Sequence, residues 1–280
     1  MATNILWYGW QPDLPDHRDI SYAAPQAVVK ALPAKVDLRN LCPEVYNQGE
    51  LGSCTANAIG GAFQFGLMKQ KAQSIFMPSR LFIYYNERVI ENTVSSDNGA
   101  QIRDGIKSVN QQGVCPETMW PYDIKKFAQK PPAATYKNAL THQVTLYQRV
   151  ARTVDQMKGC LASGYPFVFG FTAYESFEST AVAKSGKLAM PKPSEKVVGG
   201  HAVVAVGYDD AAKTFIIRNS WGNDWGQKGY FTIPYNYLLD GNLSDDFWTI
   251  RLIEDAPAAK KPKVAAKKKV VKKKTATKKK

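Results

Sequence analysis

The spacing of hydrophobic positions predicts helices in the first half of the chain. Residues 54–71, CTANAIGGAFQFGLMKQK, repeat small and apolar residues at intervals of three and four, which is the period of a helix face. Ser53 stands where it can cap this helix. Two more helices are predicted, in PSRLFIYYNERVIEN (78–92) and in IRDGIKSVNQQG (102–113), which ends in a glycine.

The second half predicts strands. After one short helix in DQMKGCLASG, apolar runs bounded by glycine and polar turns follow: FVFGFTAY, GHAVVAVGYDD, TFIIRNSW and GYFTIPYN. Helices followed by strands indicate an α+β fold with two lobes. We expect a leader or short pro-segment at 1–34, a domain at 35–254 (mainly helical to 145, mainly β from 146) and a disordered lysine-rich tail at 255–280.

The basic charge of the chain is concentrated at its C-terminal end. From Ala258 onward there are 12 lysines and no acid, so subtracting them from the net charge of +13 leaves +1 for the rest. Such a block repels itself and is typical of a disordered segment. We predict that 258–280 binds nucleic acid or another acidic surface without sequence preference, and a merely solubilising tail is the alternative. The tail has no aromatic residues for base stacking.

Targeting and redox signals indicate an intracellular protein. No run of roughly 18 apolar residues predicts a membrane-spanning helix, and the N-terminus lacks the basic and apolar regions of a secretory signal. The four cysteines form no C-x-x-C pair, which argues against a zinc ribbon and for reduced thiols. Whether Cys42 and Cys115 pair stays open, and so does the oligomeric state.

Cys54 is the candidate nucleophile. It stands where a helix should begin, in QGELGSCTANA, and a helix N-terminus together with an imidazolium lowers the pKa of a thiol. An inert buried cysteine is the equally weighted alternative on this local pattern alone. Of the three histidines, His201 opens an apolar strand after two glycines, and Asn219 on the next predicted strand could hold its other ring nitrogen.

Three segments together carry a family resemblance. QGELGSC, GHAVVAVGY and RNSWGNDWGQKGYFTI resemble the papain-like cysteine peptidase family, and the short leader resembles its bacterial and large-virus branch. His201 follows Cys54 by 147 residues, within the roughly 130–150 typical of this family. The resemblance covers about residues 33–253.

The resemblance implies a two-lobe fold with the active site in the cleft between a helical lobe and a barrel-like β lobe. It implies that Cys54 is the nucleophile, His201 the acid and base, Asn219 the residue that orients His201, and Gln48 part of the oxyanion hole. No metal or organic cofactor is implied, and the substrate is a peptide or protein. The implied substrate-binding residues are Asn98, Gly99, Gly200, Trp221 and Trp225. A plain turn is the alternative for Asn98 and Gly99, and a core position is the alternative for Trp225; Trp221 is also expected to cover the hydrogen bond between His201 and Asn219.

The chain also departs from the family pattern. Leu51 replaces a cysteine that usually forms a disulfide, Thr55 replaces a packing tryptophan, and Gly200 stands where Asp or Asn is usual. The resemblance puts the floor of the main specificity pocket between about residues 236 and 247.

We therefore expect a cysteine-type endopeptidase. The alternative from another class is a catalytically silent papain-like scaffold tethered to nucleic acid by its tail, and acyl transfer to an amine is a third reading. The leader is interpreted either as a segment that lies along the cleft or as one that packs on a lobe surface.

Overall fold

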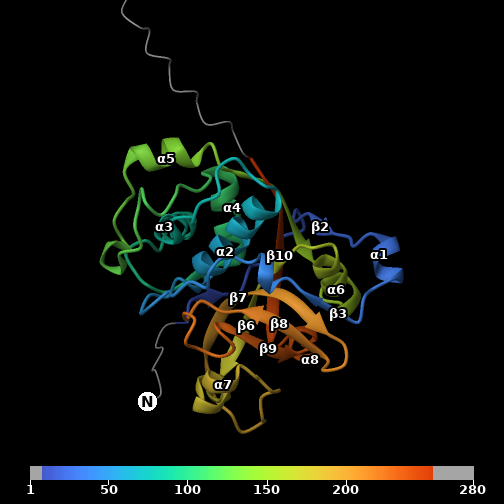
Figure 1. Cartoon of the computed structure of the whole chain (residues 1–280). Coiled ribbons are helices and arrows are strands. Elements are labelled where there is room, and N and C mark those ends of the chain that lie inside the picture. Colours follow the sequence, from blue (N-terminus) through green and yellow to red (C-terminus); the bar gives the residue numbers. More distant parts are fainter. Residues whose placement is uncertain (1–7, 255–280) are drawn as a thin grey trace, which may run out of the picture.

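The computed structural model describes residues 8–254, and the expectations for the lysine-rich tail lie outside these residues. Helices α2 (Cys54–Lys69), α3 (Arg80–Glu91) and α4 (Ile102–Gln111) lie together on one side of the molecule, and the strands lie on the other (Figure 1). The hydrophobic core is continuous through both parts. The two-lobe α+β expectation therefore agrees with the observed arrangement.

The predicted helices begin and end close to their predicted limits. Ser79 caps α3, because its hydroxyl accepts a hydrogen bond from the Phe82 N–H at 3.2 Å. Ser53 precedes α2 but caps it with no side-chain hydrogen bond, and its hydroxyl contacts that of Tyr122 instead. Gly113, just beyond α4, has the positive φ of 71° that favours glycine at such a position.

The strands form one open path in the order β2-β5-β10-β6-β7-β8-β9, and β3 pairs with β7. All four predicted strands are present as β6 to β9, whereas β5 and β10 were not predicted. The bounds are β2 (Ser21–Tyr22), β3 (Lys35–Asp37), β5 (Val144–Val150), β6 (Phe167–Tyr174), β7 (Val197–Asp209), β8 (Thr214–Arg218), β9 (Tyr230–Pro234) and β10 (Ser244–Ile253).

Helix α2 joins the two parts because it packs on β7, β10 and β6. Its residues from Cys54 to Phe63 are buried on every side, which explains why small side chains predominate there. The remaining helices are α1 (Gln26–Lys30), α5 (Ala133–Ala139), α6 (Val154–Ala162), α7 (Thr180–Ser185) and α8 (Tyr235–Leu239), with 3₁₀ turns at Arg39–Leu41, Ile124–Lys126 and Glu175–Glu178.

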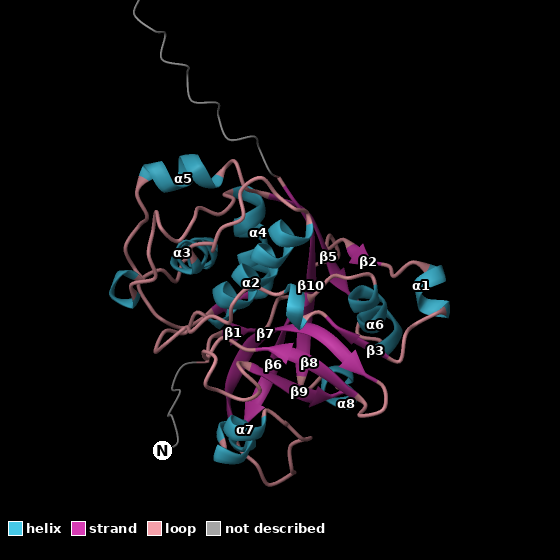
Figure 2. Cartoon of the chain, viewed as in Figure 1, coloured by secondary structure: helices cyan, strands magenta, loops and turns pink. Residues whose placement is uncertain are grey.

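The leader makes contacts on both parts of the molecule. Strand β1 (Trp10–Gln11) pairs in parallel with β4 (Ala100–Gln101), β2 pairs in parallel with β5, and α1 packs on α6. Figure 2 shows β1 at the boundary between the helices and the sheet. The leader thus contains short regular elements, each of which contacts the body of the protein.

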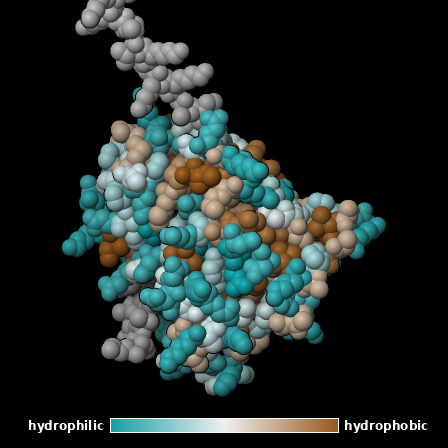
Figure 3. Space-filling view, viewed as in Figure 1, coloured by the Kyte–Doolittle hydropathy of each residue, from teal (hydrophilic) through white to brown (hydrophobic). Residues whose placement is uncertain are grey.

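All four cysteines lie within residues 8–254, and each is a free thiol, so Cys42 and Cys115 are not paired. Cys160 is fully buried in the core. No helix in the described part of the chain is long and apolar enough to cross a membrane. On the face shown in Figure 3, hydrophobic residues occur in small groups among hydrophilic ones.

Candidate active site

Cys54 is the first residue of α2, and its sulfur faces β7. The side chain is fully buried, and the Ala202 N–H donates a hydrogen bond to Sγ at 3.4 Å. Ala202 directly follows His201, so the helix start and the histidine strand meet at this sulfur. The loop before Cys54 is fixed by the Gly52 N–H, which donates to the Asp97 carboxylate at 3.1 Å.

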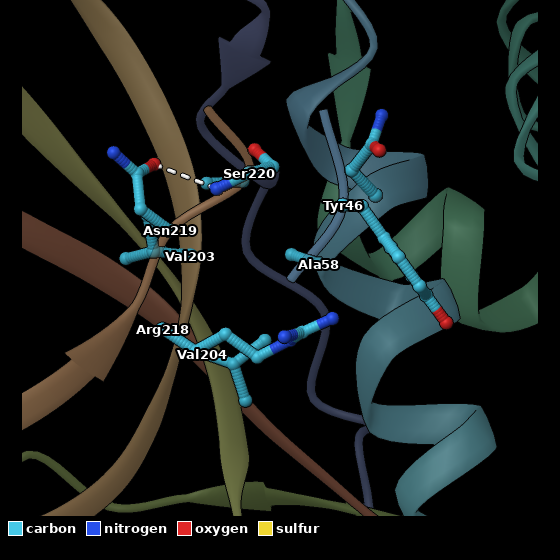
Figure 4. A pocket seen from close by; sticks show the side chains of 9 residues that line it. Tyr46, Ala58, Val203, Val204, Arg218, Asn219 and Ser220 are labelled. Atoms are coloured by element: carbon cyan, nitrogen blue, oxygen red, sulfur yellow. Dashed lines mark hydrogen bonds between the residues drawn. The ribbon is translucent and has the colours of Figure 1, made fainter. Parts of the chain in front are cut away.

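His201 is oriented by Asn219. The distance from His201 Nε2 to Asn219 Oδ1 is 2.8 Å. The same oxygen accepts from the Ser220 N–H at 2.9 Å, and Figure 4 draws this second hydrogen bond as a dashed line. Because Oδ1 is an acceptor, Nε2 carries the proton when the ring is neutral. His201 Nδ1 is buried and has no hydrogen-bond partner among the described residues, so this nitrogen is available to a proton donor.

Aromatic rings cover the His201–Asn219 hydrogen bond. The Trp221 ring stacks on the imidazole with centroids 4.9 Å apart and an interplanar angle of 29°. Phe177 packs on both rings, at 5.9 Å from His201 and 4.9 Å from Trp221. Trp225 lies behind Trp221 at 5.2 Å and is buried, so it supports Trp221 from the core. These rings exclude water from the hydrogen bond.

Gln48 is held from both sides of the cleft. Its backbone N–H donates to the Ser220 carbonyl at 2.9 Å, and the Ser220 hydroxyl donates to its side-chain oxygen at 2.6 Å. The Gln48 Nε2 donates to the Leu51 carbonyl at 3.1 Å. The side-chain amide is therefore oriented with its N–H groups toward the loop that leads to Cys54.

Gly9 of the leader lies directly over Cys54. Its carbonyl accepts from the Ala100 N–H at 2.7 Å, and its N–H is close enough to the sulfur to lower the pKa of the Cys54 thiol. The fit is so close that a Cβ atom built on Gly9 would lie 1.8 Å from the Gly52 carbonyl oxygen. One built on Gly99 would lie 1.9 Å from the Gly9 carbonyl oxygen.

Large aromatic side chains flank Gly9. Tyr8 lies 5.8 Å from the His201 ring and 6.2 Å from the Trp221 ring, and its hydroxyl donates to Glu178 at 2.9 Å. Trp10 is buried on the other side of Gly9. Residues 8–11 therefore fill the cleft over the candidate nucleophile.

The filled cleft keeps the candidate pair neutral. Burial raises the pKa of the Cys54 thiol to about 12, although the Ala202 and Gly9 N–H groups lower it. Burial lowers the pKa of His201 to about 4, although the hydrogen bond to Asn219 raises it. Both shifts favour the uncharged forms, since charges are poorly solvated there.

Four of the five predicted substrate-binding residues border the leader, and Trp225 lies in the core. The Asn98 carbonyl accepts from the Gln11 side chain at 3.0 Å, and a Cβ atom on Gly200 would lie 2.5 Å from the Trp10 carbonyl oxygen. Asn98 and Gly99 also line a surface pocket next to the leader. These glycines thus make room for a neighbouring backbone, as their sequence positions suggested.

Sequence reasoning did not identify the leader residues that fill the site, or Asp246, which binds the Trp10 indole. The signal was the triplet Tyr8-Gly9-Trp10, in which a glycine separates two large aromatic residues. Asp246 falls inside the range expected for the specificity pocket, but nothing in the local sequence distinguishes it from Asp245.

Comparison with known proteins agrees with this geometry. The family described as papain family cysteine protease matches residues 32–243. An uncharacterised peptidase C1-like protein of Acanthamoeba polyphaga mimivirus is 44% identical over 272 residues, which cover 89% of this chain and 88% of the relative. A cathepsin B-like protein of Giardia intestinalis is 30% identical, over 75% of this chain and 73% of its own length.

The fold comparison gives the same result. The crystal structure of xylellain, a cysteine protease from Xylella fastidiosa, matches with a TM-score of 0.82 and 47% identity. The match covers 87% of this chain and 95% of that one. Since the family match spans well over half of the sequence, this chain belongs to the papain family of cysteine proteases.

Proposed function

We propose that the protein is an endopeptidase that works through a thioester on Cys54, with His201 as acid and base. The observation that carries this proposal is the position of the His201 ring. Nε2 is fixed on Asn219, the buried Nδ1 has no hydrogen-bond partner within residues 8–254, and the Cys54 sulfur lies against Ala202, the next residue. An imidazole held in this way is prepared to exchange a proton with a thiol.

The proposed chemistry needs only side chains and water. With the thiol proton on His201, the Cys54 sulfur bonds to the peptide carbonyl carbon, the C–N bond breaks, and His201 gives its proton to the leaving amine. Water then attacks the thioester, its proton passes to His201, and the thiolate leaves. The Cys54 N–H and the Gln48 amide stabilise the negative oxygen in each step.

We further propose that the leader is a short pro-segment and that residues 35–254 form the peptidase domain. In support, Gly9 lies over the sulfur, and Tyr8 and Trp10 cover the cleft on both sides. A substrate backbone needs the same space, so the enzyme would be inactive until the leader moves. The Asn98 carbonyl now binds the Gln11 side chain, and the Ala100 N–H binds the Gly9 carbonyl. Once the leader has moved, Asn98 and Gly99 would be free to bind a substrate.

The test is labelling of the full chain with an epoxysuccinyl thiol-protease probe, read by intact mass and peptide mapping. We expect one adduct on Cys54 when the leader is displaced, and none in the same protein carrying His201→Ala. The absence of any adduct in the displaced form would favour the silent scaffold.

For residues 258–280 we propose binding to nucleic acid or another acidic surface, because 12 lysines stand there without an acid. Binding should weaken steeply with salt. Retention on DNA at low salt should be lost when the chain is ended at Asp255. Equal retention of both forms would leave the tail without this role.

A further inference from the structure

The Trp10 side chain occupies a pocket that the peptidase domain forms with two glycines. A Cβ atom on Gly170 of β6 would lie 2.0 Å from the indole ring, and one on Gly200 of β7 would lie 3.0 Å from it. The indole is only 8% exposed. Since any side chain at position 170 would overlap the ring, the domain leaves space here for a large group.

The floor of this pocket is the Asp246 carboxylate. Its Oδ2 accepts two hydrogen bonds, from Trp10 Nε1 at 3.0 Å and from the Asp13 N–H at 2.8 Å. Its Oδ1 lies 3.1 Å from an Arg149 nitrogen. Asp246 has a positive φ of 59°, in an irregular stretch where the β10–β6 pairing shifts register, and its side chain is 1% exposed.

The pocket is one residue away from the reacting sulfur. Trp10 is bonded to Gly9, which packs against Gly52 beside Cys54, and Gly200 is bonded to His201. Tyr8 lies on the opposite side of Gly9, against the His201 and Trp221 rings. His201 must protonate the leaving amine, and Tyr8 lies against His201. The part of a substrate that leaves as the amine therefore lies on the Tyr8 side. The part that forms the thioester, the acyl segment, lies on the Trp10 side.

We propose that, once the leader has moved, this pocket selects substrates with a large side chain that ends in an N–H donor, namely tryptophan or arginine. This side chain belongs to the acyl segment, next to the residue that forms the thioester. The inference rests on the proposed endopeptidase function and names its substrate class.

The substrate needs an N–H donor because departure of the leader exposes the Asp246 carboxylate in the pocket. When the leader withdraws, Asp246 Oδ2 loses both of its donors, the Trp10 indole and the Asp13 N–H. A leucine or phenylalanine side chain would fill the space but leave the carboxylate oxygen unpaired, which carries a desolvation penalty. A site built around a buried polar group discriminates strongly against ligands that cannot pair with it.

The experiment uses the full chain with Gly9→Val, which should displace the leader without altering the pocket. Peptidyl acyloxymethyl ketone probes that differ in one side chain (Trp, Arg, Phe, Leu or Ala) are compared by their second-order labelling rates at Cys54. We expect Trp and Arg probes to react at least about tenfold faster than Phe and Leu probes. Equal rates, or a preference for Phe and Leu, would overturn the proposal.

Two further variants in the Gly9→Val background separate the pocket from the nucleophile. Asp246→Asn keeps an acceptor and suits the positive φ, so it should lower the Arg-to-Leu rate ratio toward one without abolishing reaction of the Trp probe. Gly170→Ala should shift the preference to the Ala probe. An unchanged ratio in both variants would refute the assignment of the pocket.

The small epoxysuccinyl probe reports on the proposed function itself. It should label Cys54 in both variants, because it does not depend on the pocket. If it labels none of the proteins, including Gly9→Val alone, the endopeptidase proposal fails. If it labels all of them while the peptidyl probes show no selection, only the pocket proposal fails.

Discussion

The contact between Gly9 and Gly52 offers a direct way to open the cleft. A valine at position 9 would place its Cβ atom 1.8 Å from the Gly52 carbonyl oxygen. Its two methyl groups would need still more space. Gly9 cannot move outward freely, because its own carbonyl is hydrogen-bonded to the Ala100 N–H at 2.7 Å. In a displaced leader the same valine touches nothing, so the substitution acts on the closed state alone.

The size of the effect follows from the clash. Forcing extra methyl groups into a closely packed site costs about 1–3 kcal/mol. Since about 1.4 kcal/mol corresponds to a factor of ten, the ratio of open to closed protein should rise roughly 5- to 150-fold. Cys54 is accessible to a probe only in the open form, so its labelling rate should rise by the same factor.

The assay is the pseudo-first-order rate of epoxysuccinyl labelling, measured by intact mass on full-length wild type and Gly9→Val. Ala23→Val is the matched control, because it enlarges an exposed leader residue remote from the sulfur. We expect the control to label at the wild-type rate. If Gly9→Val also labels at that rate while its melting temperature is unchanged, residues 8–11 do not close the cleft in solution.

Three other perturbations have defined outcomes. Asn219→Ala removes the acceptor of His201 Nε2, so kcat/KM in the Gly9→Val background should fall about tenfold, measured by peptide hydrolysis with circular dichroism as a control for folding. Burial and the Asp246 carboxyl raise the pKa of Asp13 to about 7, so the closed state takes up a proton and is most stable at low pH. It weakens as pH rises from the ordinary carboxyl pKa to about 7; the wild-type labelling rate relative to Gly9→Val should rise over that range and level off above it, and Asp13→Asn should remove the rise. Burial raises the pKa of Glu87 well above 4.5, so stability is lost as pH increases beyond that value; Glu87→Gln should flatten the decrease in melting temperature between about pH 5 and 8 in calorimetry, and an equal slope in both proteins would contradict this.

The candidate site residues that could be predicted from the sequence are those that lie next to a recognisable helix or strand pattern. Cys54 follows small residues at the start of a periodic helix, and His201 and Asn219 stand on neighbouring apolar strands, so their meeting could be inferred. Strands β5 and β10 were missed because neither alternates polar and apolar residues: TLYQRV and SDDFWTIRL mix polar and charged residues with apolar ones, and in β10 even polar residues are buried. Their pairing depends on partners about 100 residues away, as in Trp248 opposite Arg149.

The leader could not be placed from sequence for a related reason. The conformation of residues 8–13 is determined by contacts with distant parts of the chain, such as Trp10 with Asp246 and Gly9 with Ala100. No helical or alternating period precedes these contacts, so the pattern showed only aromatic residues in an irregular segment. The role of a glycine between two aromatic residues can be inferred only once the surface on which it packs is known.

Closing the cleft changes the reactivity of Cys54 as well as access to it. With the leader in place, burial holds the pKa of the thiol near 12 and that of His201 near 4, so the reactive ion pair is disfavoured from both sides. Withdrawal of Gly9 removes one donor from the sulfur, but it admits water, which solvates both charges far better. The thiolate population should therefore grow in the open form, and nucleophilic catalysis depends on that population. Under the proposed function, a leader that fills the cleft and also excludes water from Cys54 and His201 would suppress the enzyme more completely than a segment of the same affinity that only blocks access.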